Sequence, residues 1–169
     1  MQPVQMTEAP AQILNFTVST SFGTAILPGD VVIVTSSAGF LNVFTSGAIP
    51  VGVCAELVPA SLSSAKRVGV YADPDQAFVV QMSTATAASV VGSGLGITTT
   101  STSVGVNRSR MMAGVVAPTA FGNQAASTST LRVMSVHPIE GIDGSTGIPA
   151  NTKLLVKFNL HQFGILLTT

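Results

Sequence analysis

The stretch KLLVKFNLHQF, residues 153–163, decides the fold class because its side chains alternate in character. One face of the predicted strand holds Leu154, Val156, Phe158 and Leu160, and the other holds Lys153, Leu155, Lys157, Asn159 and His161. A period of two is typical of a β-strand that turns one face to a core and the other to solvent. We therefore predict a half-buried strand here, with His161 on its outward face.

Shorter stretches of the same kind, rich in Val and Ile, recur along the chain. They are DVVIVTS from Asp30, KRVGVYA from Lys66, QAFVVQMS from Gln76 and LRVMSVH from Leu131. Turn-forming clusters such as Pro28-Gly29-Asp30 and Asp73-Pro74-Asp75 separate them. One short helical candidate lies around Ala85 to Val91. Short strands, Gly/Pro turns and little helix predict an all-β protein with a β-sandwich or jelly-roll-like fold.

Changes in this rhythm divide the chain into three predicted parts. Residues 1–12 contain two prolines and little periodicity, so we expect an extended N-terminal arm that is ordered only where it docks. Residues 13–62 are predicted to form a small antiparallel β unit, because Gly and Pro punctuate its strands as in hairpins. Residues 63–169 follow a predicted linker, VPASLSSAK from Val58, and are expected to form the β-sandwich or jelly-roll-like domain.

The chain carries very little charge. Seven basic and seven acidic residues make up 8% of its 169 residues, whereas a typical soluble domain has about 25%. A free monomer normally stays soluble through a charged surface, so we expect other protein to cover much of this exterior. No Lys or Arg precedes Lys66, and neither half has the dense basic stripe that nucleic-acid binding requires. We therefore predict no nucleic-acid partner.

The single cysteine, Cys54, lies in the apolar stretch PVGVCAEL. One cysteine allows no intramolecular disulfide, and its neighbours predict a buried small hydrophobic residue rather than a catalytic thiol. The first residues, MQPVQMTEAPAQ, lack a basic start and a long apolar run, so no signal peptide is expected. No segment approaches the roughly 18 consecutive apolar residues of a transmembrane helix. We expect synthesis in a cytoplasm and no membrane association.

Asp73-Pro74-Asp75 is the densest acidic cluster and permits two interpretations. Two carboxylates this close could share a hard cation, but Gln76 and the apolar residues after it supply few further oxygen ligands. As a turn, Asp73 would cap backbone amides and Pro74 would fix its own φ before the next strand. We favour a turn or an interface contact over a metal site or a catalytic pair.

Other candidate catalytic or ligand-binding patterns are weak. The glycines of Gly92-Ser93-Gly94-Leu95-Gly96 lack the Gly-Lys-Ser/Thr of a phosphate-binding loop. His137 and His161 do not have metal-ligand spacing, and no Gly-x-Ser-x-Gly motif occurs. We predict no catalytic residues, no cofactor and no metal. Because the members of a Ser-His-Asp site need not be neighbours in sequence, a small hydrolase using His137 or His161 is the enzymatic alternative.

The ordered motifs PGDVV, PVGV, VYADPDQAFVVQ and LLVKFNLHQFG, which run from residue 28 to residue 164, resemble the capsid decoration (cement) proteins of tailed bacteriophages. The more specific parts are the string Tyr71-Ala72-Asp73-Pro74-Asp75-Gln76-x-Phe78 and the closing Asn159-x-His161-Gln162. The resemblance implies a non-enzymatic β-rich structural protein on the outer surface of a virion capsid. Such a protein would form a homotrimer, clamp neighbouring subunits of the major capsid protein, and be synthesised in the host cytoplasm.

This hypothesis also assigns subunit or shell contacts. They are Met1, Val4 and Met6 in the arm, Tyr71, Asp73, Pro74, Asp75 and Gln76 around the acidic turn, and His161, Gln162 and Phe163 near the C-terminus. The alternative structural hypothesis is a tail- or fibre-associated protein or a host-adhesion module that displays Ser/Thr-rich loops. A pilus or surface-layer subunit is a third, which the missing export signal disfavours.

Overall fold

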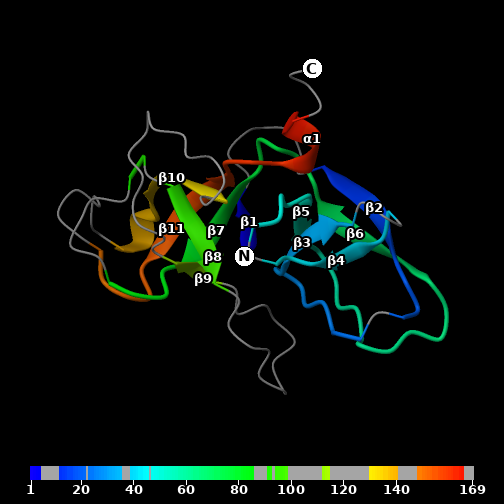
Figure 1. Ribbon diagram of the computed structural model, residues 1–169. Helices are drawn as coiled ribbons and strands as arrows, with labels where there is room; N and C mark the ends of the chain where they lie inside the picture. The colour runs from blue at the N-terminus through cyan, green and yellow to red at the C-terminus, as the bar shows by residue number, and fades with distance from the viewer. Residues whose placement is uncertain are drawn as a thin grey trace.

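The computed structural model describes residues 1–4, 12–21, 23–35, 39–45, 47–85, 91–92, 94–98, 112–114, 130–140 and 148–165. It confirms the all-β prediction, because two antiparallel sheets account for nearly all of its regular structure. The helical elements described are one 3₁₀ turn, η1 (Pro138–Glu140), and one short helix, α1 (Gln162–Ile165). Figure 1 shows the two sheets on either side of β1, with α1 beyond one end of the second sheet.

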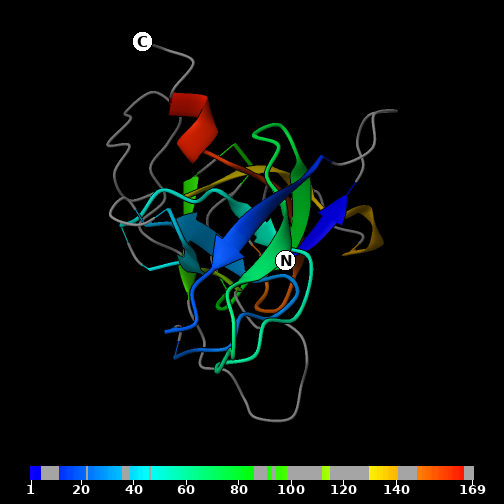
Figure 2. The same cartoon turned by 90° about the vertical axis from the view of Figure 1, so that its right-hand side faces the viewer.

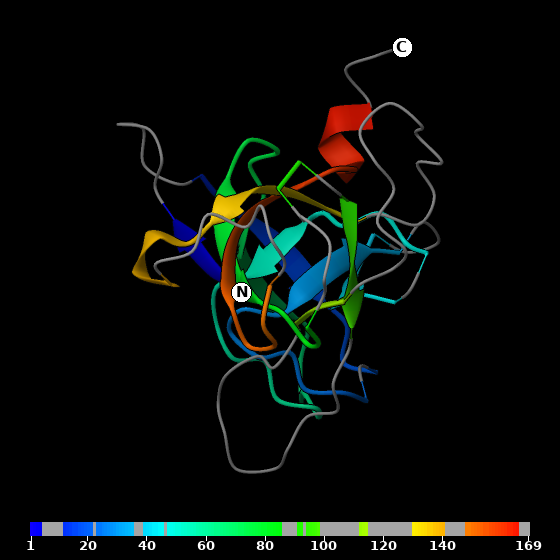
Figure 3. The same cartoon turned by 90° about the vertical axis from the view of Figure 1, so that its left-hand side faces the viewer.

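The first sheet has six strands in the order β1-β7-β11-β10-β8-β9. Their bounds are β1 (Gln2–Val4), β7 (Ala77–Gln81), β11 (Lys153–Phe158), β10 (Leu131–Val136), β8 (Gly94–Thr98) and β9 (Met112–Gly114). Figure 3 looks toward this sheet, with β10 and β11 in front. The first six residues of KLLVKFNLHQF therefore form an interior strand, β11, which is paired on both sides.

The second sheet has five strands in the order β2-β6-β5-β3-β4. Their bounds are β2 (Ile13–Val18), β6 (Lys66–Tyr71), β5 (Gly52–Cys54), β3 (Val31–Val34) and β4 (Leu41–Val43). The sheet curls into a half-barrel, so that its edge strands β2 and β4 approach each other. Figure 2 shows β2 lying along β6 on the outer side of this sheet.

Two hydrophobic cores follow from the alternation of side chains across β3 and β5. Val31, Ile33 and Val53 contribute to a core that also contains residues of the first sheet, such as Phe78 and Val156. We call this cluster between the sheets the sandwich core. The alternate residues Val32 and Cys54 join Val68 and Val70 inside the curled sheet, and we call that cluster the inner core. Residues adjacent along β3 thus serve different cores, as the strand period of two requires.

The N-terminal strands β1 and β2 pair with the two strands that flank the acidic turn, one in each sheet. β1 pairs with β7 in the first sheet, and β2 pairs with β6 in the second. The turn at residues 73–76 lies where β6 passes into β7. The predicted boundary after residue 62 falls between β5 and β6, which are hydrogen-bonded neighbours in a single sheet.

The backbone geometry explains why the motifs PGDVV and PVGV contain glycine. Gly29 of PGDVV has a φ of 92°, which suits glycine in the turn closed by the bond from the Asp30 N–H to the Leu27 carbonyl, 2.9 Å. Gly52 of PVGV has a φ of 154°, and a Cβ built there would collide with the carbonyl oxygen of Tyr71. The close approach of β5 to β6 therefore requires glycine at position 52.

The structure confirms the predicted inward face as far as Phe158; Leu160, also assigned to that face, lies beyond the end of the strand. Leu154, Val156 and Phe158 lie in the sandwich core as expected. Leu155 is also buried, because β11 is a central strand. The prediction that His161 faces outward is wrong: the strand ends at Phe158, the chain turns into α1, and His161 is only 4% exposed.

Two sequence features noted above lie in the middle of the chain. Most of the helical candidate around Ala85 to Val91 lies outside the described residues. Gly94 to Thr98, which overlaps the glycine-rich stretch, forms β8 and pairs with β10 and β9. This part of the stretch is thus a strand of the first sheet.

Candidate functional site

The string from Tyr71 to Phe78 and the closing string from Asn159 to Gln162 meet inside the molecule. Phe78 of the first string packs on Phe158, just before the second, with ring centroids 5.4 Å apart. Phe158 packs on His161 at 5.9 Å, and His161 packs on Phe163 at 5.6 Å. Phe163 in turn stacks on Phe16 of β2 at 6.2 Å. We call these five residues the ring chain.

The ring chain connects the two hydrophobic cores. Phe78 and Phe158 belong to the sandwich core, while Phe163 and Phe16 pack against the inner core. Each aromatic pair of this kind is worth about 0.5–1.5 kcal/mol beyond the burial of its area. His161 is the central member of the ring chain and lies between the end of β11 and the start of α1. The residues around His161 therefore connect the C-terminal end of β11, in the first sheet, to the second sheet.

His161 is buried with a defined arrangement of its ring nitrogens. Nδ1 accepts a hydrogen bond from the Phe163 N–H at 3.1 Å, so the neutral ring carries its proton on Nε2. Nε2 is buried and has no hydrogen-bond partner among the described residues. Burial lowers the pKa of His161, and the backbone of Val51 and the charge of Asp73 oppose this shift. The ring is therefore neutral at physiological pH.

Gln162 attaches α1 to β3 through a pair of hydrogen bonds like those between neighbouring strands. Its side-chain Oε1 accepts from the Val34 N–H at 3.1 Å, and its Nε2 donates to the Val34 carbonyl at 3.0 Å. Its backbone N–H donates to the Pro50 carbonyl at 2.9 Å. The pairing of β3 with β5 covers Val31 and Val32 and does not reach Val34. Gln162 supplies the missing donor and acceptor.

The acidic cluster at residues 73–75 forms the expected turn. The Asp75 N–H donates to Asp73 Oδ1 at 2.9 Å, and the Gln76 N–H donates to the Asp73 carbonyl at 3.1 Å. Asp75 Oδ1 also lies 3.3 Å from Lys157 Nζ in an ion pair whose aspartate side chain is 92% exposed. Such an exposed pair contributes little to stability. Within the described part of the chain, no three His, Cys, Asp or Glu side chains gather as a metal site.

The remaining predicted contact residues have internal neighbours as well. Met1 is buried in the sandwich core, and its α-amino group donates to the Gly29 carbonyl at 2.6 Å. Val4 pairs with Ala77 through its backbone, while Met6 lies outside the described residues. Gln76 is buried and its Nε2 donates to the Ala77 carbonyl at 2.8 Å.

Accessibility separates the residues of the acidic turn from the other predicted contacts. Tyr71, at the end of β6, is half-buried and packs against the sandwich core. Asp73 and Pro74 are half-buried, whereas Asp75 is exposed. In this single chain the segment 73–75 is therefore the most accessible of the described segments predicted to make contacts.

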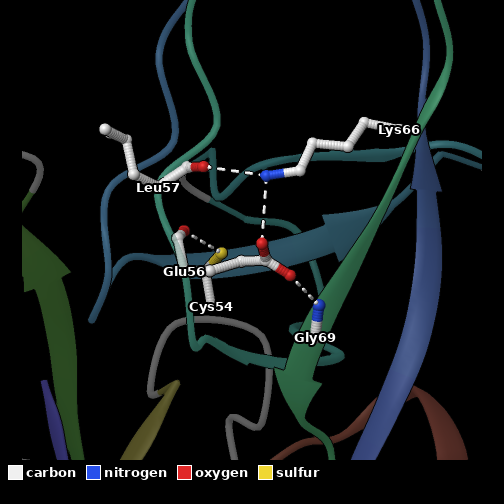
Figure 4. Close-up of polar contacts among 5 residues, drawn as sticks. All are labelled: Cys54, Glu56, Leu57, Lys66 and Gly69. Atoms are coloured by element: carbon white, nitrogen blue, oxygen red, sulfur yellow. Dashed lines mark hydrogen bonds and ion pairs between the residues drawn. The ribbon is translucent and has the colours of Figure 1, made fainter.

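Sequence reasoning missed a polar cluster around Glu56, shown in Figure 4. Glu56 Oε2 lies 3.0 Å from Lys66 Nζ, which also donates to the Leu57 carbonyl at 3.2 Å. Glu56 Oε1 accepts from the Gly69 N–H at 2.9 Å. The Gly69 N–H, followed by Lys66, holds the pKa of Glu56 below its usual value. Pairing this carboxylate with a backbone amide depends on the β5–β6 register, which local sequence does not reveal.

Cys54 lies beside this cluster and is not an activated thiol. Its Sγ donates to the Glu56 carbonyl at 3.0 Å, and its side chain is 1% exposed in the inner core. Burial raises the pKa of Cys54 to about 11, so the thiol stays protonated at neutral pH. The sequence prediction of a buried small hydrophobic residue is confirmed.

Comparison with known protein families and with curated proteins finds no match for this chain. Among the described residues, no helix has the length and apolar character needed to cross a membrane. The arrangement around His161 and Gln162 can hold two sheets together.

Proposed function

We propose that this protein is a structural capsid decoration protein that forms a homotrimer on the outer surface of a phage head and clamps neighbouring major capsid subunits. The observation that carries the proposal is the sparse charge, seven basic and seven acidic residues in 169. A surface so poor in charge is best tolerated where like copies and a shell cover it. The sequence resemblance and the all-β fold support the same function.

Clamping of this kind needs no chemistry beyond burial of surface. A stable protein–protein contact buries about 1,600 Å² in total, and each Å² of apolar area contributes about 25 cal/mol before the costs of association. The edge strands β1 and β9 of one sheet and β2 and β4 of the other offer backbone groups for pairing. Many such contacts over one head would resist the pressure of packed DNA.

The positions of the predicted contact residues suggest a division of labour within this proposal. Asp73, Pro74 and Asp75 are accessible and would contact a neighbouring subunit or the shell. Met1, Gln76 and His161 are buried within the chain, so they would act by fixing the shape of the contacting surface. Deleting the N-terminal arm would remove part of the sandwich core as well as any contact, so it is a poor test of docking.

The decisive experiment combines native mass measurement with shell binding. The purified chain is expected to have the mass of a trimer. It should also co-sediment with expanded, undecorated heads of the phage that encodes it. Asp75→Arg should lower occupancy without changing the denaturation midpoint, because Asp75 is almost fully exposed. Lys153→Glu, at the exposed start of β11, is the control, because it also changes the net charge by two units, in the opposite direction. A monomer that stays in the supernatant would overturn the proposal, and binding to glycans or host cells instead would favour the adhesion alternative.

A further inference from the structure

We propose that His161 is an acid-sensitive latch: a second proton on its ring releases Phe163 and α1 from the five-stranded sheet and so loosens the connection between the two sheets. This inference concerns the fold of the single chain and does not depend on the proposed function. It rests on the burial of the imidazole, the orientation of its two nitrogens, and the few bonds that hold α1.

The ring has no acceptable place for a second proton. Nδ1 accepts the Phe163 N–H at 3.1 Å, so a proton there would place two N–H groups against each other and break that bond. Nε2 already carries the proton of the neutral ring and has no hydrogen-bond partner among the described residues. The protonated imidazolium would be a charge in a residue only 4% exposed, with its Nδ1–H facing the Phe163 N–H, which is a costly state.

The neighbours of the ring offer little compensation. Phe158 and Phe163, the rings on its two sides, carry no charge. The backbone of Val51, which precedes β5, and the charge of Asp73, in the turn between β6 and β7, both favour the protonated ring, but burial outweighs them and the pKa of His161 is lowered. Asp73 is engaged with the Asp75 N–H, and no ion pair joins it to His161 among the described residues. Release of Phe163 and α1 from the second sheet would therefore accommodate the proton.

The element that opens is held by few interactions. α1 has four residues, and an isolated helix shorter than about 12 residues is not stable in water. Gln162 attaches it to Val34 and Pro50, and Phe163 attaches it to His161 and Phe16. Loss of the hydrogen bond between the Phe163 N–H and His161 removes one of these attachments and weakens the neighbouring ones made by Gln162. The strands of both sheets keep their own ladders, so local opening is expected before global unfolding.

The pH window follows from proton linkage. Burial lowers the pKa of His161 in the closed form, while in the open form it returns toward its ordinary value near 6.5. Between those two values the open form binds more protons than the closed form. The opening constant should therefore rise about tenfold for each unit that the pH falls within this window. Below the closed-form pKa both forms are protonated and the effect levels off.

The test is hydrogen exchange of backbone amides by NMR from pH 7.5 to pH 4.5, corrected for the intrinsic exchange rate, together with titration of the two histidine rings. The amides of Phe163 and Val34 should lose protection over the pH range in which open His161 takes up its proton. Strand amides such as that of Val156 should not follow. The neutral ring of His161 should show the proton on Nε2 at pH 7.

His137 provides a matched control. Its Nδ1 also accepts an N–H two residues ahead, that of Ile139 at 3.3 Å, but its side chain is less buried. Asparagine can keep such an acceptor without titrating, so His161→Asn should remove the pH dependence of the Phe163 amide. His137→Asn should leave that dependence as in the wild type.

Either of two results would overturn the latch. One is a Phe163 amide whose protection stays constant while the wild-type His161 ring titrates. The other is an acid-induced loss of protection that persists in a folded His161→Asn variant. Where that variant does not fold, the wild-type comparison alone decides, because coincident or separate pH ranges for ring and amide are both observable.

Discussion

The side-chain amide of Gln162 pairs with the backbone of Val34 as a strand residue would, accepting its N–H at 3.1 Å and donating to its carbonyl at 3.0 Å. The two residues are 128 positions apart in the chain. This pair and the ring chain beside it connect the segment that follows β11 of the first sheet to β3 of the second sheet. The predictions below test that connection and the contacts around it.

Gln162→Ala should destabilise the protein by about 1–3 kcal/mol, because it leaves the part-buried N–H and carbonyl of Val34 without partners. Urea denaturation followed by circular dichroism measures the change. Gln81→Ala is the matched control: it removes one exposed bond, to the Asn151 carbonyl, and should cost less than about 0.5 kcal/mol. Equal effects of the two substitutions would contradict the role given to Gln162.

Phe16 and Phe163 should show a coupling free energy of about 0.5–1.5 kcal/mol in a double-mutant cycle, because their rings stack at 6.2 Å. The four proteins are the wild type, Phe16→Leu, Phe163→Leu and the double variant, compared by denaturation. Phe16 and Phe78 stand at opposite ends of the ring chain and serve as the control pair. A control coupling as large as that of the stacked pair would refute a direct contact.

Gly52→Ala should destabilise the protein by at least about 2 kcal/mol. Its φ of 154° is strained for other residues, and a Cβ would collide with the Tyr71 carbonyl. Gly23→Ala is the control, since a Cβ there meets nothing within 4 Å, and its effect should stay within about 0.5 kcal/mol. Thermal unfolding of the two variants distinguishes them, and a neutral Gly52→Ala would show that β5 and β6 are farther apart than described.

Cys54 should resist alkylation in the folded protein. Raising the pKa of the thiol from 9.0 to about 11 lowers the thiolate fraction about 100-fold at pH 8, and burial restricts access further. Iodoacetamide labelling followed by mass spectrometry should be slow in buffer and fast in denaturant. Rapid labelling of the native protein would contradict the buried position of Cys54 in the inner core.

Glu56 should contribute to stability at neutral pH and lose that contribution in acid. Its pKa is lowered by the Gly69 N–H and by Lys66, so the unfolded chain binds the proton more readily. The stabilisation is full above the ordinary glutamate pKa near 4.3 and disappears as the pH falls through the lower folded value. Glu56→Gln should flatten this part of the stability–pH curve, whereas Asp75→Asn, at an exposed carboxylate, serves as the comparison. An unchanged curve for Glu56→Gln would contradict the pairing.

Local chemistry made the turn and the strands predictable. Asp73-Pro74-Asp75 reads as a turn because its hydrogen bonds lie within the cluster, and the buried face of β11 follows from alternation alone. The same alternation misplaced His161, because it was continued past Phe158, where the strand ends. Nothing near Gln162 reveals that its partner is Val34, 128 positions away, because that contact depends on the arrangement of distant strands. The assignment of outward contacts to these residues remains a prediction.

The second sheet is made from one continuous segment, β2 to β6, which lies in sequence between β1 and β7 of the first sheet. β1 and β7 pair with each other, so this segment has the topology of an insertion between two neighbouring strands. Recombination could therefore exchange β2 to β6 as a unit, provided that the new unit presented apolar residues where Val31, Ile33 and Val53 now meet the first sheet.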